Sequence, residues 1–269
     1  MAVSLAFDSV AAARGGTALR SGGAHAPRAD QQHHHHRPVG AAPARVPQPQ
    51  RQADGLAPLE EVGTTQRFAA GSIIVFEGDD VLDCFRVVSG AVRLSKLTVD
   101  GRRQVLDFRV RGEFLGIPGL DIHAWTAEAI CDVELRRYPL RRLEALVETR
   151  PGLARRLLAL AARELKAAQD QMLLLGRKHA HERLASFLLR MAAAAGQDDP
   201  RPGAAFDLPM SRNDIADHLG LTVETVSRAF TALRRDGTIA LPRPNRVVLL
   251  RPVALGELAE GNLDERRAG

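Results

Sequence analysis

The stretch Ser211–Arg228, S-R-N-D-I-A-D-H-L-G-L-T-V-E-T-V-S-R, predicts two short helices joined by a tight turn. Ser211 is a good N-cap for the first helix, and Asp214 follows three residues later, close to a capping box. Gly220 is expected to end the first helix because it tolerates positive φ, and Thr222 is expected to cap the second. The buried stripe of the second helix is predicted from apolar residues at helical spacing: Val226, Ala229, Phe230 and Leu233.

The opposite face of the second helix carries side chains suited to DNA. Arg binds the acceptor edge of guanine, Glu accepts from the cytosine amino group, Ser is an adaptable partner, and Val touches a thymine methyl. Residues three and four apart share a helix face, which gives the predicted base readers Val223, Glu224, Ser227 and Arg228. A second group is expected to cap the helices or contact the DNA backbone: Ser211, Arg212, Thr222 and Thr225.

A predicted β-hairpin follows these helices. Residues 237–241 and 247–250 form its strands, and the basic segment Pro242–Arg246 forms its turn. The hairpin stands where the wing of a winged helix would be. The alternative interpretation is a pair of ordinary surface helices with a solvated Glu/Arg pair, and the wing favours DNA recognition over it.

Composition and charge narrow the class of protein. The chain has 269 residues, which suggests one or two domains, a net charge of +5 and two cysteines. Residues 177–252 carry twelve Arg and Lys against eight Asp and Glu, so most of the positive charge lies where DNA would be contacted. No apolar run approaches the ~18 residues of a membrane span, and the first twenty residues lack a signal-peptide core. We expect a cytoplasmic protein without a membrane partner.

The rest of the chain divides into segments of different character. Residues 1–55 are a low-complexity tail that we expect to be disordered, and the run His33–His36 within it is either a weak metal ligand or compositional drift. Residues 56–150 alternate short β-type runs with glycines, as in a small antiparallel roll. A long helix is predicted over 151–176, a winged helix-turn-helix over 177–252, and a C-terminal tail over 253–269. The predicted fold class is α+β.

The long helix carries an apolar stripe that predicts a homodimer. Apolar residues recur there at steps of three to five residues, which is similar to a coiled coil, and the predicted seam residues are Leu153, Leu157, Leu160, Leu165 and Met172. Packing of the helix on its own roll is the alternative. No paired acid and base, phosphate loop or metal-ligand spacing is found, and His179 and His181 point in different directions on a helix. We therefore expect neither an enzyme nor a metal site.

The order of roll, long helix and winged helix-turn-helix resembles the Crp/Fnr family of bacterial transcription regulators over residues 56–252. The most specific matches are Pro209–Ala216 and Gly220–Arg228, and the core V-E-T-V-S-R is similar to the Fnr/FixK branch. The resemblance implies a homodimer that binds a TTGAT-N4-ATCAA palindrome. Arg228 and Glu224 would share the G·C pair, and Ser227 and Val223 would flank it. RNA polymerase would be contacted by roll loops near residues 100–103.

The residues that would bind a signal molecule or cluster differ from those of the relatives. Gly112-Glu113 is present, but the later segment Ala124–Ala127 lacks the Arg that cyclic-AMP receptors use to bind the phosphate. We therefore expect no binding of cyclic AMP. Gly112-Glu113 is assigned to the architecture of the roll. A [4Fe–4S] cluster needs four thiolates, so two cysteines exclude it within one chain. Cys84 and Cys131 are either an oxidation switch or buried structural thiols.

The leading hypothesis is a FixK-like activator of low-oxygen or nitrogen-oxide respiration genes, or of nitrogen-fixation genes, that needs no cofactor. The alternative is a Crp-type regulator gated by an unidentified small molecule.

Overall fold

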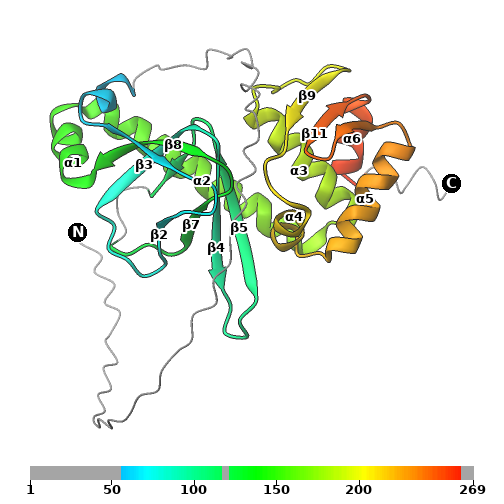
Figure 1. Cartoon of the computed structure of the whole chain (residues 1–269). Helices are drawn as coiled ribbons and strands as arrows, with labels where there is room; N and C mark the ends of the chain where they lie inside the picture. Colours follow the sequence, from blue (N-terminus) through cyan, green and yellow to red (C-terminus); the bar gives the residue numbers. More distant parts are fainter. Residues whose placement is uncertain (1–55, 117–120, 262–269) are drawn as a thin grey trace, which may run out of the picture. The chain divides into compact units, whose positions relative to one another are not determined.

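The computed structural model describes residues 56–116 and 121–261 (Figure 1). The predicted N-terminal tail with its His run lies outside these residues, as do the last eight residues of the chain. Among the helices that the structure describes, none is both long and apolar enough to cross a membrane.

The first half of the described chain is an antiparallel roll, as predicted. Its elements are η1 (Ala57–Glu61), β1 (Thr64–Phe68), β2 (Ile73–Val75), β3 (Asp83–Ser89), β4 (Ala91–Leu97), β5 (Arg103–Val110), β6 (Phe114–Leu115), β7 (Thr126–Ala129) and β8 (Val133–Pro139). Within the described ranges they form two sheets, in the orders β1-β8-β3-β6 and β2-β7-β4-β5. Val87, Leu94 and Leu135 belong to the apolar cluster of the roll.

Two turns of the roll require glycine, because of a positive φ angle or a close backbone contact. Gly101 has φ +77° in the β4–β5 turn, where an Asp-Gly pair is typical of a hairpin. Gly90 has φ +85° between β3 and β4, and a Cβ there would lie 2.5 Å from the backbone oxygen of Asp132. A side chain at residue 90 would therefore force the roll apart.

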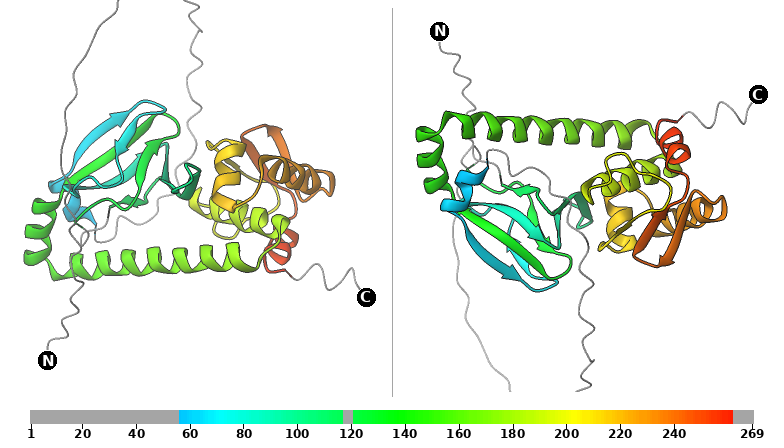
Figure 2. Two further views of the ribbon diagram at one scale, coloured as in Figure 1. Left: turned by 90° about the horizontal axis from the view of Figure 1, so that it is seen from below. Right: turned by 90° about the horizontal axis from the view of Figure 1, so that it is seen from above.

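Two helices follow the roll, α1 (Leu140–Thr149) and α2 (Pro151–Arg177). Pro151 stands at the first position of α2, where its missing N–H costs nothing. Figure 2 shows α2 as one uninterrupted green helix. This confirms the long helix predicted over 151–176.

The seam predicted on α2 needs correction. Leu153 is fully buried with Leu59 and Tyr138 of its own chain, and Leu157 and Leu160 pack against the same cluster. The remaining two predicted seam residues are free: Leu165 is 61% exposed and Met172 is 65% exposed. The spacing of apolar residues in the sequence did not distinguish the two faces of α2. At ~100° per residue, Leu165 lies roughly 120° around the helix from Leu153.

The exposed face of α2 has a heptad of its own. Leu158 is 71% exposed, and with Ala162, Leu165 and Met172 it follows steps of four, three and seven residues. That spacing is typical of a coiled-coil seam. The alternative of a helix packed on its own roll is thus correct for one face of α2, and the other face is unpartnered in the single chain.

The winged helix-turn-helix consists of α3 (Ala180–Ala194), β9 (Ala204–Asp207), α4 (Arg212–Leu219), α5 (Val223–Arg235), β10 (Ile239–Arg243), β11 (Arg246–Leu249) and α6 (Pro252–Ala259). Its strands form a sheet in the order β10-β11-β9. The predicted boundary at residue 252 falls at the first residue of α6. Because Leu255 and Ala259 of α6 are buried in the core with α3, that core extends beyond the boundary that the sequence suggested.

Candidate DNA-recognition site

The two helices of the recognition motif are set by local hydrogen bonds. The Ser211 hydroxyl accepts from the Asp214 N–H at 3.1 Å, and the Asp214 carboxylate accepts from the Ser211 N–H at 3.1 Å. Gly220 ends α4 with φ +61°, and the Thr222 hydroxyl accepts from the Thr225 N–H at 3.2 Å. The capping box, the left-handed turn and the second cap all occur as predicted.

The helix α5 divides into a buried and an exposed face. Its predicted stripe is buried, namely Val226, Ala229, Phe230 and Leu233. Three of the predicted base readers, Glu224, Ser227 and Arg228, are exposed, and Val223 is half-buried against the core. Neither Glu224 nor Arg228 forms an ion pair with any residue in the described part of the chain. Their charged ends therefore remain available to a ligand.

A shallow groove continues the exposed face along α5. Its lining residues are Ser227, Arg228, Thr231, Ala232 and Arg235. Thr231 and Arg235 are not among the predicted base readers, although Thr231 stands one turn beyond Ser227 and Arg235 two turns beyond Arg228. Helical spacing from Ser227 and Arg228 would have found them.

Arg212 has a structural role that the sequence did not reveal. Its guanidinium lies 3.4 Å from the centroid of the Phe230 ring and donates a hydrogen bond to the backbone oxygen of Pro244 at 3.0 Å. Burial lowers the pKa of Arg212. The side chain thus links the start of α4 to α5 and to the wing, in addition to its predicted place near the DNA backbone.

The wing is the β10–β11 hairpin. Its strands shift register between Ala240 and Arg243, and the Asn245 carbonyl accepts from the Leu208 N–H at 2.7 Å. Arg246 forms an ion pair with Asp207 at 3.1 Å, whereas Arg243 is exposed at the tip. The tip therefore presents positive charge beside α5, as a phosphate contact requires.

Gly112 and Glu113 close a turn of the roll. The Glu113 carboxylate accepts from the Val110 N–H at 2.8 Å, and Gly112 has φ +88°. Burial raises the pKa of Glu113. These contacts are those of the roll architecture to which the sequence assigned the pair.

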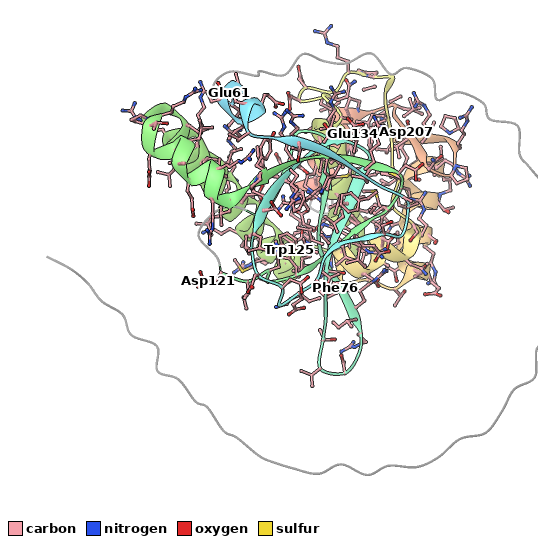
Figure 3. All side chains as sticks on the ribbon, turned by 60° about the vertical axis from the view of Figure 1, so that its left-hand side comes forward. Glu61, Phe76, Asp121, Trp125, Glu134 and Asp207 are labelled. Atoms are coloured by element: carbon pink, nitrogen blue, oxygen red, sulfur yellow. The ribbon has the colours of Figure 1, made fainter. Side chains whose placement is uncertain are left out.

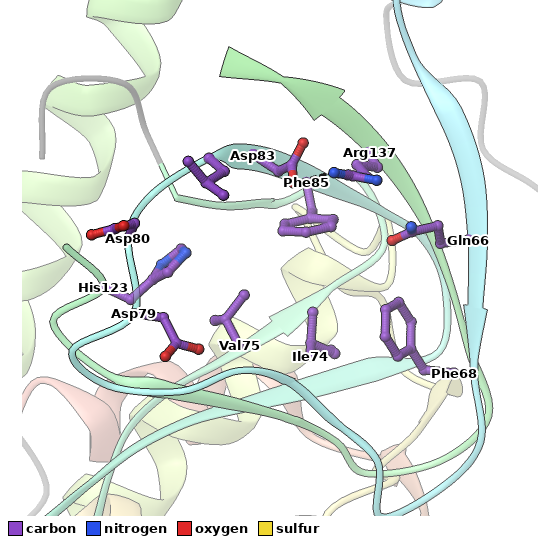
Figure 4. A pocket seen from close by; sticks show the side chains of 11 residues that line it. Gln66, Phe68, Ile74, Val75, Asp79, Asp80, Asp83, Phe85, His123 and Arg137 are labelled. Carbon is purple, nitrogen blue, oxygen red and sulfur yellow. Dashed lines mark ion pairs between the residues drawn. The ribbon is translucent and has the colours of Figure 1, made fainter. Parts of the chain in front are cut away.

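A cavity of about 540 Å³ opens in the roll (Figure 4). Its lining includes aromatic and aliphatic residues of β1, β2 and β3, with Phe68, Val75 and Phe85 among them. Polar lining residues include Asp79, Asp80, Asp83, His123 and Arg137. The Arg137 guanidinium is held by Asp83 at 2.6 Å. Figure 3 places Phe76 and Asp121 on the loops of the same domain.

The two cysteines differ in their surroundings. Cys84 is buried, and burial, with a smaller effect of the Asp83 charge, raises the pKa of its thiol to about 12. Because the thiolate is the reactive form, this favours the structural interpretation of Cys84. Cys131 is only half-buried. The described residues contain no cluster of three or more side chains able to hold a metal ion.

Comparisons with known proteins agree with this architecture. Residues 65–150 match the cyclic nucleotide-binding domain family, and residues 182–258 match the Crp-like helix-turn-helix domain family. The nitrogen fixation regulation protein FixK of Bradyrhizobium diazoefficiens is 42% identical over 208 residues, which cover 76% of this chain and 85% of that protein. The transcriptional activator protein FnrL of Cereibacter sphaeroides is 36% identical over 200 residues, covering 73% and 81%.

A solved structure is similar as well. The structure of FixK2 from Bradyrhizobium japonicum aligns with a TM-score of 0.68 at 40% identity, covering 73% of this chain and 97% of that one. The roll, the long helix and the recognition motif thus recur together in a relative of known structure. The chain belongs to the Crp/Fnr family of transcription regulators, with FixK proteins among its relatives.

Proposed function

We propose that this protein is a FixK-type transcription activator that binds a TTGAT-N4-ATCAA palindrome as a homodimer and controls low-oxygen or nitrogen-oxide respiration genes or nitrogen-fixation genes. The observation that carries the proposal is the exposed face of α5, where Glu224, Ser227 and Arg228 stand on a helix whose other face is fully buried. A relative named for nitrogen fixation regulation and another named as a transcriptional activator support the biological role.

The dimer of this proposal forms along the exposed face of α2. Leu158, Leu165 and Met172 are large apolar side chains that the single chain leaves in solvent. A second copy of the helix would cover them through heptad packing, with Ala162 allowing close approach. Two recognition helices would then be presented to two half-sites, as a palindrome requires.

The proposed activator works without a bound cofactor. Carboxylates outnumber cations in the lining of the roll cavity, and the guanidinium of Arg137 already pairs with Asp83. A cyclic nucleotide phosphate would therefore meet negative charge there without a free arginine. Contact with RNA polymerase is assigned to the β4–β5 turn, where Val99 and Asp100 are exposed.

The test is a binding titration in air, without added ligand, on the palindrome and on a scrambled duplex. Selective binding is expected. Replacing Arg228 by Ala should cost about 1–3 kcal/mol on the palindrome and relax selectivity at the G·C pair. The matched control is Arg201→Ala, which removes an exposed arginine from the loop before β9. Equal losses for both variants, or equal losses on both duplexes, would contradict the assignment.

A ligand-gated regulator is the second candidate, and the cavity of about 540 Å³ in the roll favours it. A ligand that binds only the folded state raises the melting temperature. A panel of nucleotides and metabolites that includes cyclic AMP would separate the two candidates. Stabilisation by one compound, together with selective DNA binding only in its presence, would replace the cofactor-free proposal.

A further inference from the structure

Two arginines of the roll hold the first helix of the recognition motif. Arg93 of β4 pairs with Asp214 of α4. Arg103 of β5 pairs with Asp214 at 2.9 Å and with Asp217 at 2.6 Å. Gln104 adds a hydrogen bond to the backbone oxygen of Asp217 at 2.7 Å. Arg93, Arg103 and Gln104, with Asp214 and Asp217 of α4, form what we call the α4 clamp.

The clamp is buried around Asp214 and half-buried at its outer pair, where the side chains of Arg103 and Asp217 are 30% and 32% exposed. Asp214 is 4% exposed and Arg93 is 9% exposed. Exposed ion pairs contribute little, but removing one partner of a buried pair leaves a charge without compensation. The Arg93–Asp214 contact therefore restrains α4 more strongly than a pair in solvent would, and the half-buried Arg103 adds to this restraint through Asp214 and Asp217.

An apolar contact between β5 and α4 lies beside the clamp. Val105 and Phe108 of β5 are fully buried in the same cluster as the recognition domain. The His218 ring of α4 packs against both Phe108 and Phe187, with ring centroids 5.2 Å and 5.7 Å away. Its Nδ1 atom is 3.4 Å from the Val105 backbone oxygen. One strand, β5, thus contacts α4 through charge and through packing.

Asp214 connects the clamp to the local fold. One carboxylate oxygen accepts from the backbone N–H and the hydroxyl of Ser211, and the other binds Arg93 and Arg103. Burial alone would raise the pKa of Asp214, but these hydrogen bonds and charges lower it. The group that starts α4 is therefore the group that the roll holds.

The covalent connection to the dimer helix is short and not helical. α2 ends at Arg177, Lys178 is extended at φ −85° and ψ 146°, and α3 begins at Ala180. Arg183 braces this link by donating to the backbone oxygens of Lys178 at 2.8 Å and Leu219 at 2.8 Å. A helix break of two residues permits rotation, so the contact with the roll is needed to fix the direction of α4.

We propose that Arg93 and Arg103 are positioning residues that fix the orientation of the recognition helices and thereby the half-site spacing that the dimer accepts. The inference rests on the proposed function, because it needs a palindromic operator. The clamp uses one face of α4, through Asp214, Asp217 and His218, while the reading face of α5 stays exposed. Clamp and DNA are therefore engaged at the same time.

The experiment compares operators whose spacer varies from two to six base pairs, together with a single half-site. The variant is Arg103→Gln, and its control is Arg102→Gln, the neighbouring residue, which is exposed and pairs with Asp100 of the same turn. We expect Arg103→Gln to reduce the preference for the four-base-pair spacer by about tenfold, the factor given by ~1.4 kcal/mol, with unchanged half-site binding. Arg102→Gln should keep the wild-type profile.

A charge swap tests whether the pairing itself matters. Arg103→Asp combined with Asp217→Arg should recover much of the spacing preference, although Asp217→Arg alone should lose it. Loss of half-site binding in parallel with spacing preference would show a general folding defect and overturn the inference. An unchanged spacing profile in Arg103→Gln would overturn it as well.

A second readout does not need DNA. Amide hydrogen exchange of α4 should be faster in Arg103→Gln than in the wild type and unchanged in Arg102→Gln. If the wild type fails to prefer the palindrome over a scrambled duplex, the proposed function fails, and this exchange measurement still judges the clamp. Equal exchange in all three proteins would refute it.

Discussion

His218 makes the folded protein sensitive to acid. Its imidazole is 2% exposed, and burial, with a smaller effect of the Arg190 charge, lowers its pKa from 6.5 to about 4. Asp107 and the backbone acceptors near Val105 oppose this shift without reversing it. The folded protein therefore holds a neutral histidine where the unfolded chain binds a proton.

The sign and size of the effect follow from this difference. A neutral His218 adds stability that is fully present above pH 6.5 and is lost as the pH falls toward 4. Each pH unit inside this window removes about 1.4 kcal/mol, so the total is about 3 kcal/mol. For a protein with a total stability of ~5–15 kcal/mol, that loss is large.

The assay is urea unfolding at fixed protein concentration from pH 7 to pH 4, for the wild type and for His218→Gln. Gln does not titrate in this range and keeps a donor for the Val105 oxygen. The nearby carboxylates Asp107 and Asp214 are present in both proteins and their pKa values are lowered by the charges and hydrogen bonds around them, so the difference between the two curves in this pH range reports mainly on His218. We expect the advantage of the wild type over the variant to shrink by about 3 kcal/mol between pH 7 and pH 4. Parallel curves would refute the reasoning, because a histidine that titrates normally adds no pH dependence.

Three further predictions concern other parts of the molecule. Leu165→Glu should abolish dimerisation, measured by analytical ultracentrifugation, and leave the melting temperature of the roll close to that of the wild type. Leu160→Glu should lower that melting temperature, because it places a charge against a partly buried apolar cluster of its own chain. Equal effects of the two variants would argue against two separate faces of α2. In native protein at pH 8 a thiol reagent should label Cys131 and spare Cys84, whose thiol has a pKa of about 12, until denaturant is added. Gly220→Ala should cost about 1–2 kcal/mol of unfolding free energy because φ is +61° there, and a loss near zero in a thermal denaturation experiment would mean that α4 ends differently.

Local chemistry made the recognition motif predictable. Ser211, Gly220 and Thr222 each act on a neighbour within three residues, so their roles can be read from the sequence alone. The buried stripe of α5 follows for the same reason, since the helical period determines which residues share a face. Glycines between short β-type runs predicted the roll, because positive φ at Gly101 is a property of the turn itself.

Contacts between distant segments were not predictable. Leu153 and Leu158 look alike in the sequence, and only the packing of η1 and α1 decides which of them is buried. Arg93 and Asp214 are 121 residues apart, and a lone arginine in a strand normally suggests a solvated side chain. One signal was available in the sequence, where Arg93 stands between Val92 and Leu94 in a short β-type run. A charge in such a strand needs a partner.

Arg228 and Arg103 are proposed to act on different properties of operator recognition, namely base selection and half-site spacing. Arg228 stands on the exposed face of α5, so its loss should weaken binding at every spacer length by a similar factor. Arg103 faces α4 from the roll, so its loss should change which spacer is preferred. Because the two residues share no partner, their free-energy effects should add within about 0.5 kcal/mol in a double variant on the four-base-pair spacer. A larger coupling would mean that the clamp also shapes the reading face, and that base selection and spacing are set by one mechanism.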